Sequence, residues 1–154
     1  MRTRPETMIF HGAVVILLGL LAGFPYALVV TGTLASSERA WRMAHLEGIL
    51  NGLTLIAVAA VAPWLVLGRR TQRALAWLLI VTAWGNIVPS VIGPLFGGRG
   101  LEFGGSAANS VMYVLFVAAV VAVLVAMVLV FVGALRRARV ASLAAGDAKT
   151  ARPG

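Results

Sequence analysis

Long apolar stretches separated by short polar breaks divide this chain into four segments. The stretches cover about residues 8–30, 37–67, 73–96 and 109–135. Each is long enough to cross the hydrocarbon core of a bilayer, which takes about 20 residues of α-helix. Hydrocarbon offers the backbone no water to bond with, so these segments must be helical. The pattern predicts an all-α, polytopic membrane protein whose four transmembrane helices form an antiparallel bundle.

We assign residues 1–137 to one four-helix transmembrane domain. Residues 138–154 are basic and rich in alanine, and we expect them to form a disordered cytoplasmic tail. The first apolar run is too long for the h-region of a signal peptide, and three more spans follow it. We therefore expect it to be retained as a helix.

Basic residues gather on one side of this topology. Three of the 13 lysines and arginines, namely Arg39, Arg42 and Arg99, fall on one side. The other ten fall on the side of the termini and the second connector: Arg2, Arg4, Arg69, Arg70, Arg73, Arg136, Arg137, Arg139, Lys149 and Arg152. Short loops rich in lysine and arginine stay in the cytoplasm. We predict cytoplasmic termini, in a multi-pass protein of a bacterial-type inner (plasma) membrane.

Composition agrees with a membrane protein and removes several classes of function. Hydrophobic residues make up 60% of the chain, charged residues 12%, and the mean hydropathy is +0.96, which is far from a soluble domain. The net charge of +8 lies at helix ends, so we expect contacts with the lipid bilayer and with anionic lipid, and no nucleic acid. The absence of cysteine excludes disulfides and thiolate metal sites. A chain this short has few residues with which to enclose a polar pocket, so we expect a homo-oligomer with sites between subunits.

A polar run inside the second span, AHLEGILNG at 44–52, is the main candidate for chemistry, because polar groups are costly in hydrocarbon. Gly48 and Gly52 follow His45 at i+3 and i+7, so the three share one helix face. A histidine beside a wall without side chains could hold a planar macrocycle, and haem iron commonly takes a proximal histidine. The alternative is a histidine bonded to a backbone carbonyl, with glycines that only pack helices.

The second histidine, His11, is predicted near the opposite end of the bundle from His45. One iron could hardly be clamped by both within a protomer. A five-coordinate haem with an open face for substrate therefore fits better than a bis-histidine electron carrier. For His11 itself we favour packing at a helix end.

Two further polar residues lie near His45 in the second span. Asn51 lies about 120° around the helix from His45, and it either lines a pocket or bonds to a neighbouring helix. Glu47 is expected to form an ion pair with an arginine on the same side of the membrane.

The third span carries a second polar stripe, Thr82, Asn86 and Ser90, at successive i+4 positions. We interpret it as a second pocket wall; the alternative is that the hydroxyls bond back to their own helix. The glycine-rich connector at 97–105 suggests a lid or re-entrant turn, and Tyr113 an interfacial anchor. The sequence shows no Ser-His-Asp set and no carboxylate pair, which argues against hydrolysis.

Taken together, these marks resemble the hydroxylaminobenzene mutases and the related membrane-bound styrene oxide isomerases. The similarity extends over all four spans, and the motif in the second span is its most specific part. The matching residues are HG at 11–12, LLGLLAG at 17–23, AHLEGILNG at 44–52, Trp84 and Asn86.

Both groups are small integral membrane isomerases. The resemblance implies a homotrimer of four-helix protomers that hold haem b, with His45 as axial ligand and Asn51 beside the open face. In styrene oxide isomerases, ferric iron acts as a Lewis acid on the epoxide oxygen and promotes rearrangement to an aldehyde. This chain has Thr82 where those enzymes carry an aspartate, and Ser90 where they carry a tyrosine. The resemblance therefore leans toward the mutase branch.

The function implied is that of a hydroxylaminobenzene mutase-like enzyme, which rearranges a small aromatic substrate, an arylhydroxylamine, to an aminophenol. Two alternatives stay open: an aryl epoxide isomerase, and a haem-binding membrane sensor or electron carrier that is not an enzyme. The expected catalytic residues are Asn51, Asn86, Thr82 and Ser90. The expected haem contacts are His45, Gly48 and Gly52, with Arg42 and Arg99 on the propionates.

Overall fold

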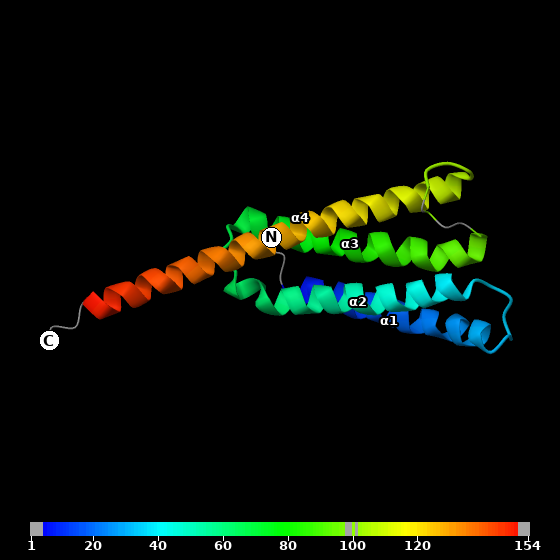
Figure 1. Ribbon diagram of the computed structural model, residues 1–154, viewed down its shortest axis with the longest axis horizontal. Coiled ribbons are helices and arrows are strands. Elements are labelled where there is room, and N and C mark those ends of the chain that lie inside the picture. Colours follow the sequence, from blue (N-terminus) through cyan, green and yellow to red (C-terminus); the bar gives the residue numbers. More distant parts are fainter. Residues whose placement is uncertain (1–4, 98–99, 101, 151–154) are drawn as a thin grey trace.

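Four long helices make up the computed structural model, which describes residues 5–97, 100 and 102–150. They are α1 (Pro5–Val30), α2 (Glu38–Val61), α3 (Arg69–Phe96) and α4 (Ala107–Thr150), with a 3-10 turn, η1 (Ala62–Trp64), after α2. All four are long and apolar enough to cross a membrane. Figure 1 shows α1 beside α2 and α3 beside α4, with successive helices running in opposite directions. The predicted all-α, four-span fold is confirmed.

The helix ends differ from the predicted ones where local chemistry overrides hydropathy. The second span was expected to run to residue 67, but α2 ends at Val61 because Pro63 lacks the N–H that a continuing helix needs. Helix α3 begins four residues earlier than expected, directly after Gly68. Helix α4 begins at Ala107, where the hydroxyl of Ser106 accepts the backbone N–H of Asn109 at 3.1 Å.

The segment from residue 138 was expected to be disordered, but α4 continues as a helix to Thr150. Alanine, leucine and arginine are strong helix formers, and an existing helix extends without a new nucleation step. Figure 1 shows this extension projecting beyond the other three helices.

Helices α1 and α2 approach each other through opposed glycines. A Cβ on Gly12 would stand 2.8 Å from the Gly52 carbonyl oxygen, and one on Gly19 would stand 2.8 Å from the Gly48 Cα. Membrane helices gain little from the hydrophobic effect between them, so such close backbone approach supplies dispersion contact instead. The two GxxxG glycines of α2 therefore hold α1 in place.

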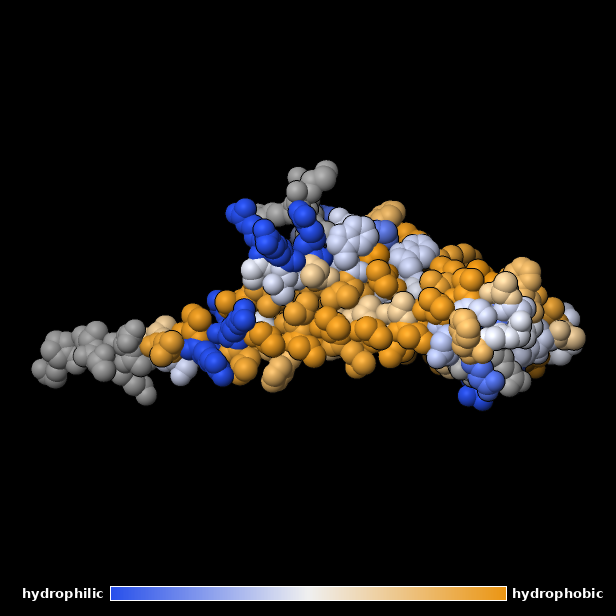
Figure 2. Space-filling view, turned by 90° about the horizontal axis from the view of Figure 1, so that it is seen from above, coloured by the Kyte–Doolittle hydropathy of each residue, from blue (hydrophilic) through white to orange (hydrophobic). Residues whose placement is uncertain are grey.

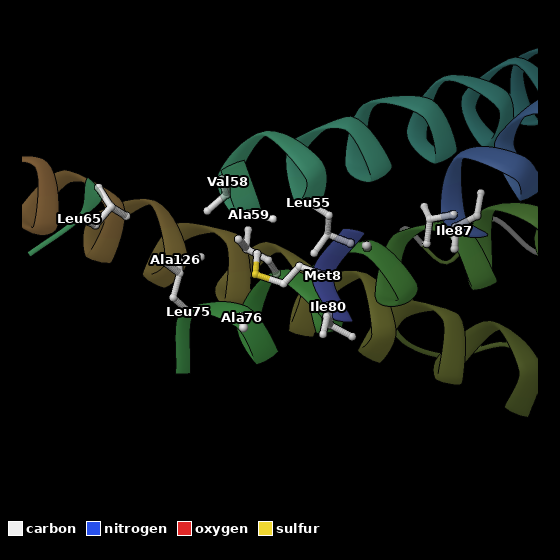
Figure 3. Packing of buried hydrophobic residues seen from close by; sticks show 13 residues of the cluster. Met8, Leu55, Val58, Ala59, Leu65, Leu75, Ala76, Ile80, Ile87 and Ala126 are labelled. Carbon is white, nitrogen blue, oxygen red and sulfur yellow. The ribbon is translucent and has the colours of Figure 1, made fainter. Parts of the chain in front are cut away.

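Helix α3 is the most enclosed of the four spans. Just over half of its membrane window is buried, against 17% for α1 and α4. The core around it is apolar, and Figure 3 shows Leu55, Ile80 and Ile87 projecting into the space between the helices. Figure 2 shows an apolar side along the bundle, with hydrophilic side chains toward its ends. Lipid or further subunits can cover that side.

Candidate active site

His45 lies two turns into α2 and faces α1. Its Nδ1 is 2.9 Å from the carbonyl oxygen of Gly19. Because a carbonyl can only accept, Nδ1 carries the proton, and in the neutral ring Nε2 keeps the lone pair. The ring also lies against Gly23, where a Cβ would stand 3.0 Å from Nδ1, and nearly parallel to the Tyr26 ring. Helix α1 thus fixes both the tautomer and the position of this imidazole.

This arrangement suits a single metal ligand. Histidines that bind metals usually donate their other ring N–H to a carbonyl or carboxylate, which orients the ring and raises its basicity. His45 has that donation in place through Gly19. The described residues contain no group of three His, Cys, Asp or Glu that could hold a bare metal ion. One imidazole with its Nε2 lone pair available is the side chain that a porphyrin iron commonly takes from a protein.

The second histidine has the opposite tautomer. The indole N–H of Trp84 on α3 donates to Nδ1 of His11 at 3.1 Å, so Nδ1 accepts, and Nε2 of the neutral ring carries the proton. Phe10 packs edge-on against the same imidazole. His11 therefore joins α1 to α3 and offers no free ring lone pair, in agreement with the packing role that we favoured.

The expected open wall on α2 is not open. Gly48 packs on the backbone of Gly19, and Gly52 packs on Gly12 and Ile16. The missing side chains admit a helix rather than a macrocycle, because glycine stripes let membrane helices meet closely. The prediction of a flat cofactor wall at Gly48 and Gly52 is wrong for this face, and the alternative, helix packing, describes both residues.

Four polar side chains meet where α2 faces α3. The Ser90 hydroxyl donates to the Glu47 carboxylate, and the Asn86 amide donates to the Asn51 Oδ1 at 3.3 Å. The Asn51 amide also donates to the Glu47 carbonyl oxygen at 2.9 Å. Glu47 and Asn51 are separated by one i+4 step on α2, and Asn86 and Ser90 by one on α3. Because the two helices are antiparallel, the first residue of each pair lies opposite the second residue of the other. We call Glu47, Asn51, Asn86 and Ser90 the α2–α3 polar cluster.

Within the cluster, Asn51 and Asn86 do not use all of their hydrogen-bonding groups. After the bonds described, Asn51 retains one amide N–H, and Asn86 retains its carbonyl oxygen and one N–H. These groups lie half-buried between two spans. Each of these groups could form a further hydrogen bond.

Thr82 does not belong to this cluster. Its hydroxyl lies 2.8 Å from the Leu78 carbonyl oxygen on its own helix and 3.3 Å from that of Ala119 on α4. An i+4 step turns a helix by about 40°, so two steps carry Ser90 about 80° away from Thr82. The predicted three-residue wall is corrected: Asn86 and Ser90 face α2, whereas Thr82 faces α4.

The expected ion pairs also differ. Glu47 was expected to meet an arginine, but its partner is Ser90. Arg42 lies 3.9 Å from Glu38 at the exposed start of α2, which is a weak surface pair. Its contact with a haem propionate stays a prediction, and the same contact predicted for Arg99 lies outside the described residues.

The glycine-rich connector is organised by Asn109. The Asn109 Oδ1 accepts the N–H of Gly100 at 2.9 Å, and its amide donates to the carbonyl oxygens of Glu102 and Gly104. Tyr113 packs edge-on against Phe103 from the same connector. Both residues therefore shape the connector.

Sequence reasoning missed the α1 side of the site. Gly19, Gly23 and Tyr26 surround His45, yet none of the three was among the expected site residues. The i+4 spacing of Gly19 and Gly23 was the available signal. It could not show which side chain from another helix would fill the space.

Comparisons with known proteins agree on one family. The family model described as styrene oxide isomerase matches residues 5–135. Hydroxylaminobenzene mutase HabB of Ectopseudomonas oleovorans is 29% identical over 89 residues, which is 58% of this chain and 51% of the relative. The match thus spans about half the length of that curated relative.

Proposed function

The chain belongs to the styrene oxide isomerase family, and from this premise we propose that it is a membrane isomerase of the hydroxylaminobenzene mutase type. It would move the hydroxyl of an arylhydroxylamine from nitrogen to the ring and release an aminophenol. The observation that carries the proposal is the imidazole of His45, whose Nδ1–H is held by the Gly19 carbonyl while Nε2 keeps its lone pair. The curated mutase relative favours this reaction over others.

Haem b is the proposed cofactor, and Nε2 of His45 would hold its iron. The chemistry that ferric haem supplies when bound is Lewis acidity toward a lone pair of the substrate. The chain's own contribution is to hold the imidazole in the required tautomer and to keep its ring oriented between Gly23 and Tyr26.

The isomerisation conserves atoms and electrons. The N–O bond breaks, a C–O bond forms, the ring carbon loses a proton and the nitrogen gains one, so no external oxidant or reductant is needed. The spare amide groups of Asn51 and Asn86 would donate to and accept from the –NHOH group and orient it, while apolar side chains surround the ring. Ser90 would hold the Glu47 carboxylate in place.

The second candidate is an aryl epoxide isomerase that forms an aldehyde, and the printed name of the matching family favours it. Styrene oxide isomerases position the epoxide with an aspartate and a tyrosine, where this chain has Thr82 and Ser90. The Ser90 hydroxyl faces α2, but the Thr82 hydroxyl faces α4. Because only one of the two positions lies at the α2–α3 polar cluster, we favour the mutase over the epoxide isomerase.

Parallel product analysis tests both candidates. Membranes from an expressing strain would receive phenylhydroxylamine or styrene oxide, with membranes of the His45→Gln variant as control. We expect aminophenol from the first substrate only, and none from the variant. Aldehyde from styrene oxide without aminophenol would overturn the mutase assignment in favour of the second candidate.

A haem sensor or electron carrier would show neither product. Carbon monoxide binding to the reduced, purified protein separates these classes further. A five-coordinate haem with an open face binds the ligand, whereas an electron carrier with two axial ligands does not.

The proposed assembly is a homotrimer in a bacterial-type inner membrane, with both termini in the cytoplasm. The large outward apolar surfaces of α1 and α4 are compatible with contacts between neighbouring protomers. Native mass measurement in detergent tests it, since a purely monomeric, active preparation would contradict the trimer.

A further inference from the structure

One face of the first turns of α3 is basic and hollowed. Five exposed residues there line an open hollow of about 350 Å³: Arg69, Arg70, Arg73, Ala74 and Trp77. Each residue advances the helix by about 100°, so these positions share one face about 140° wide. Hydrophilic side chains gather at this end of the bundle in Figure 2, next to the apolar side.

The charge at this face opposes the dipole of its own helix. A helix N-terminus carries partial positive charge and favours acidic side chains. The first turn of α3 contains no acidic residue and instead contains Arg69 and Arg70. Arg69 and Arg70 are therefore unfavourable against the dipole of their own helix, and an anion lying against this face would offset that cost.

The residues next along the face distinguish a lipid from a free anion. Trp77 is 53% exposed, and Val81, one turn deeper on the same face, is 44% exposed. Tryptophan is favoured at the boundary between headgroups and acyl chains. Along this face the arginines would therefore meet the phosphate of a phospholipid, Trp77 the boundary below it, and Val81 the acyl chain. Inorganic phosphate would contact only the arginines.

We propose that this face of α3 binds one anionic phospholipid, such as phosphatidylglycerol. Its phosphodiester contacts the three arginines, and its acyl chain lies over Trp77 and Val81. The site is separate from the proposed chemistry at His45, so it does not depend on the isomerase assignment.

The chain supplies a matched control on α4. Arg136, Arg137 and Arg139 carry the same charge and are exposed. They lie at a similar level, because the Val66 N–H, just before α3, donates to the Gly133 carbonyl oxygen at 3.2 Å. Helix α4 contains no tryptophan. If the protein were only attracted to an anionic surface in general, the three arginines of α3 and the three of α4 would contribute equally. If α3 has a specific lipid site, only the three arginines of α3 should matter.

Native mass spectrometry of the full-length protein in detergent tests the proposal with phosphatidylglycerol, phosphatidylcholine and inorganic phosphate as probes. We expect one phosphatidylglycerol per protomer and no phosphatidylcholine. Each arginine strengthens binding to anionic lipid roughly fivefold, so replacing Arg69, Arg70 and Arg73 by Gln should weaken it by roughly 100-fold. The α4 triple Gln variant should retain binding within about twofold. Equal losses in both variants, or displacement of the lipid by millimolar phosphate, would overturn the proposal.

Loss of three arginines from this connector can also disturb membrane insertion, so a second measurement uses the wild-type protein. Photoactivatable phosphatidylglycerol is cross-linked in vesicles, and the modified peptides are identified. Modification concentrated at residues 69–81 supports the site. Modification spread evenly over α1 and α4 contradicts it.

Discussion

At the scale of single residues, two histidines of the same chain are held in opposite tautomers. Gly19 accepts from Nδ1 of His45, whereas Trp84 donates to Nδ1 of His11. A metal needs a ring lone pair, and only the first arrangement leaves Nε2 with one. Sequence reasoning could select His45 from its neighbours in the motif. It could not foresee the tautomer, because the Gly19 carbonyl that sets it lies 26 residues away in the sequence.

Replacing Gly23 by Ala should disturb the proposed ligand without removing it. The added Cβ would stand 3.0 Å from Nδ1 and 3.2 Å from Cε1 of His45, so the ring must shift away from the Gly19 carbonyl. Loss of such a supporting bond typically weakens metal binding about 10–100-fold. Haem retention during purification and the position of the absorption bands measure the effect. Gly12→Ala is the control: it crowds the same helix pair at Gly52 and should lower thermal stability without altering the spectrum.

The two polar side chains of α3 that face different helices should separate activity from stability. Asn86→Leu removes the donor to Asn51 and an orienting amide, so we expect kcat/KM for the arylhydroxylamine to fall at least about 10²-fold. Thr82→Val removes the hydroxyl contacts with the Leu78 and Ala119 carbonyl oxygens, both outside the α2–α3 polar cluster, so activity should persist while stability falls by about 0.6 kcal/mol. Equal losses of activity in the two variants would contradict the assignment of the cluster.

At the scale of helices, hydropathy alone located all four spans, because a bilayer imposes length and apolarity on each. The ends of the helices, and the faces that pack against a neighbouring helix, were harder to predict. Pro63 ended α2 early, and the face of Gly48 and Gly52, expected to be open, is covered by α1. A helical pattern shows which residues share a face, but not which partner lies against it. The α2–α3 polar cluster was foreseen only in part for the same reason: Asn86 and Ser90 face α2 as one stripe, whereas Thr82 faces α4.

Enlarging Gly48 should separate α1 from α2. Its Cβ position overlaps the backbone of Gly19, which cannot move aside as a flexible side chain can. We expect Gly48→Leu to destabilise the bundle by about 1–3 kcal/mol, the range for overpacking in a tight interior. Gly68→Ala, at a position with open space around it, is the matched control. Unfolding in mixed micelles of increasing SDS content measures both, and equal stabilities would contradict the close packing.

At the scale of the whole molecule, four antiparallel spans place the connectors after α1 and α3 at one end and the connector after α2 at the other. The hydropathy pattern predicts this arrangement of the spans. Which end faces the cytoplasm is predicted from the distribution of basic residues alone. Because the chain has no cysteine, single cysteines report topology without background. A membrane-impermeant maleimide applied to intact cells should label Ala35→Cys and spare Ala138→Cys. The reverse pattern would invert the proposed orientation.

The absorption spectrum of the purified protein tests whether His45, and no other side chain of this chain, holds a haem iron. The two matched variants are His45→Gln, which keeps a donor for the Gly19 carbonyl, and His11→Gln, which keeps an acceptor for the Trp84 indole. We predict a Soret band in the wild type and in His11→Gln, and its loss in His45→Gln. A wild-type protein that converts its substrate without a Soret band, or a His45→Gln variant that keeps the band, would contradict haem ligation by His45.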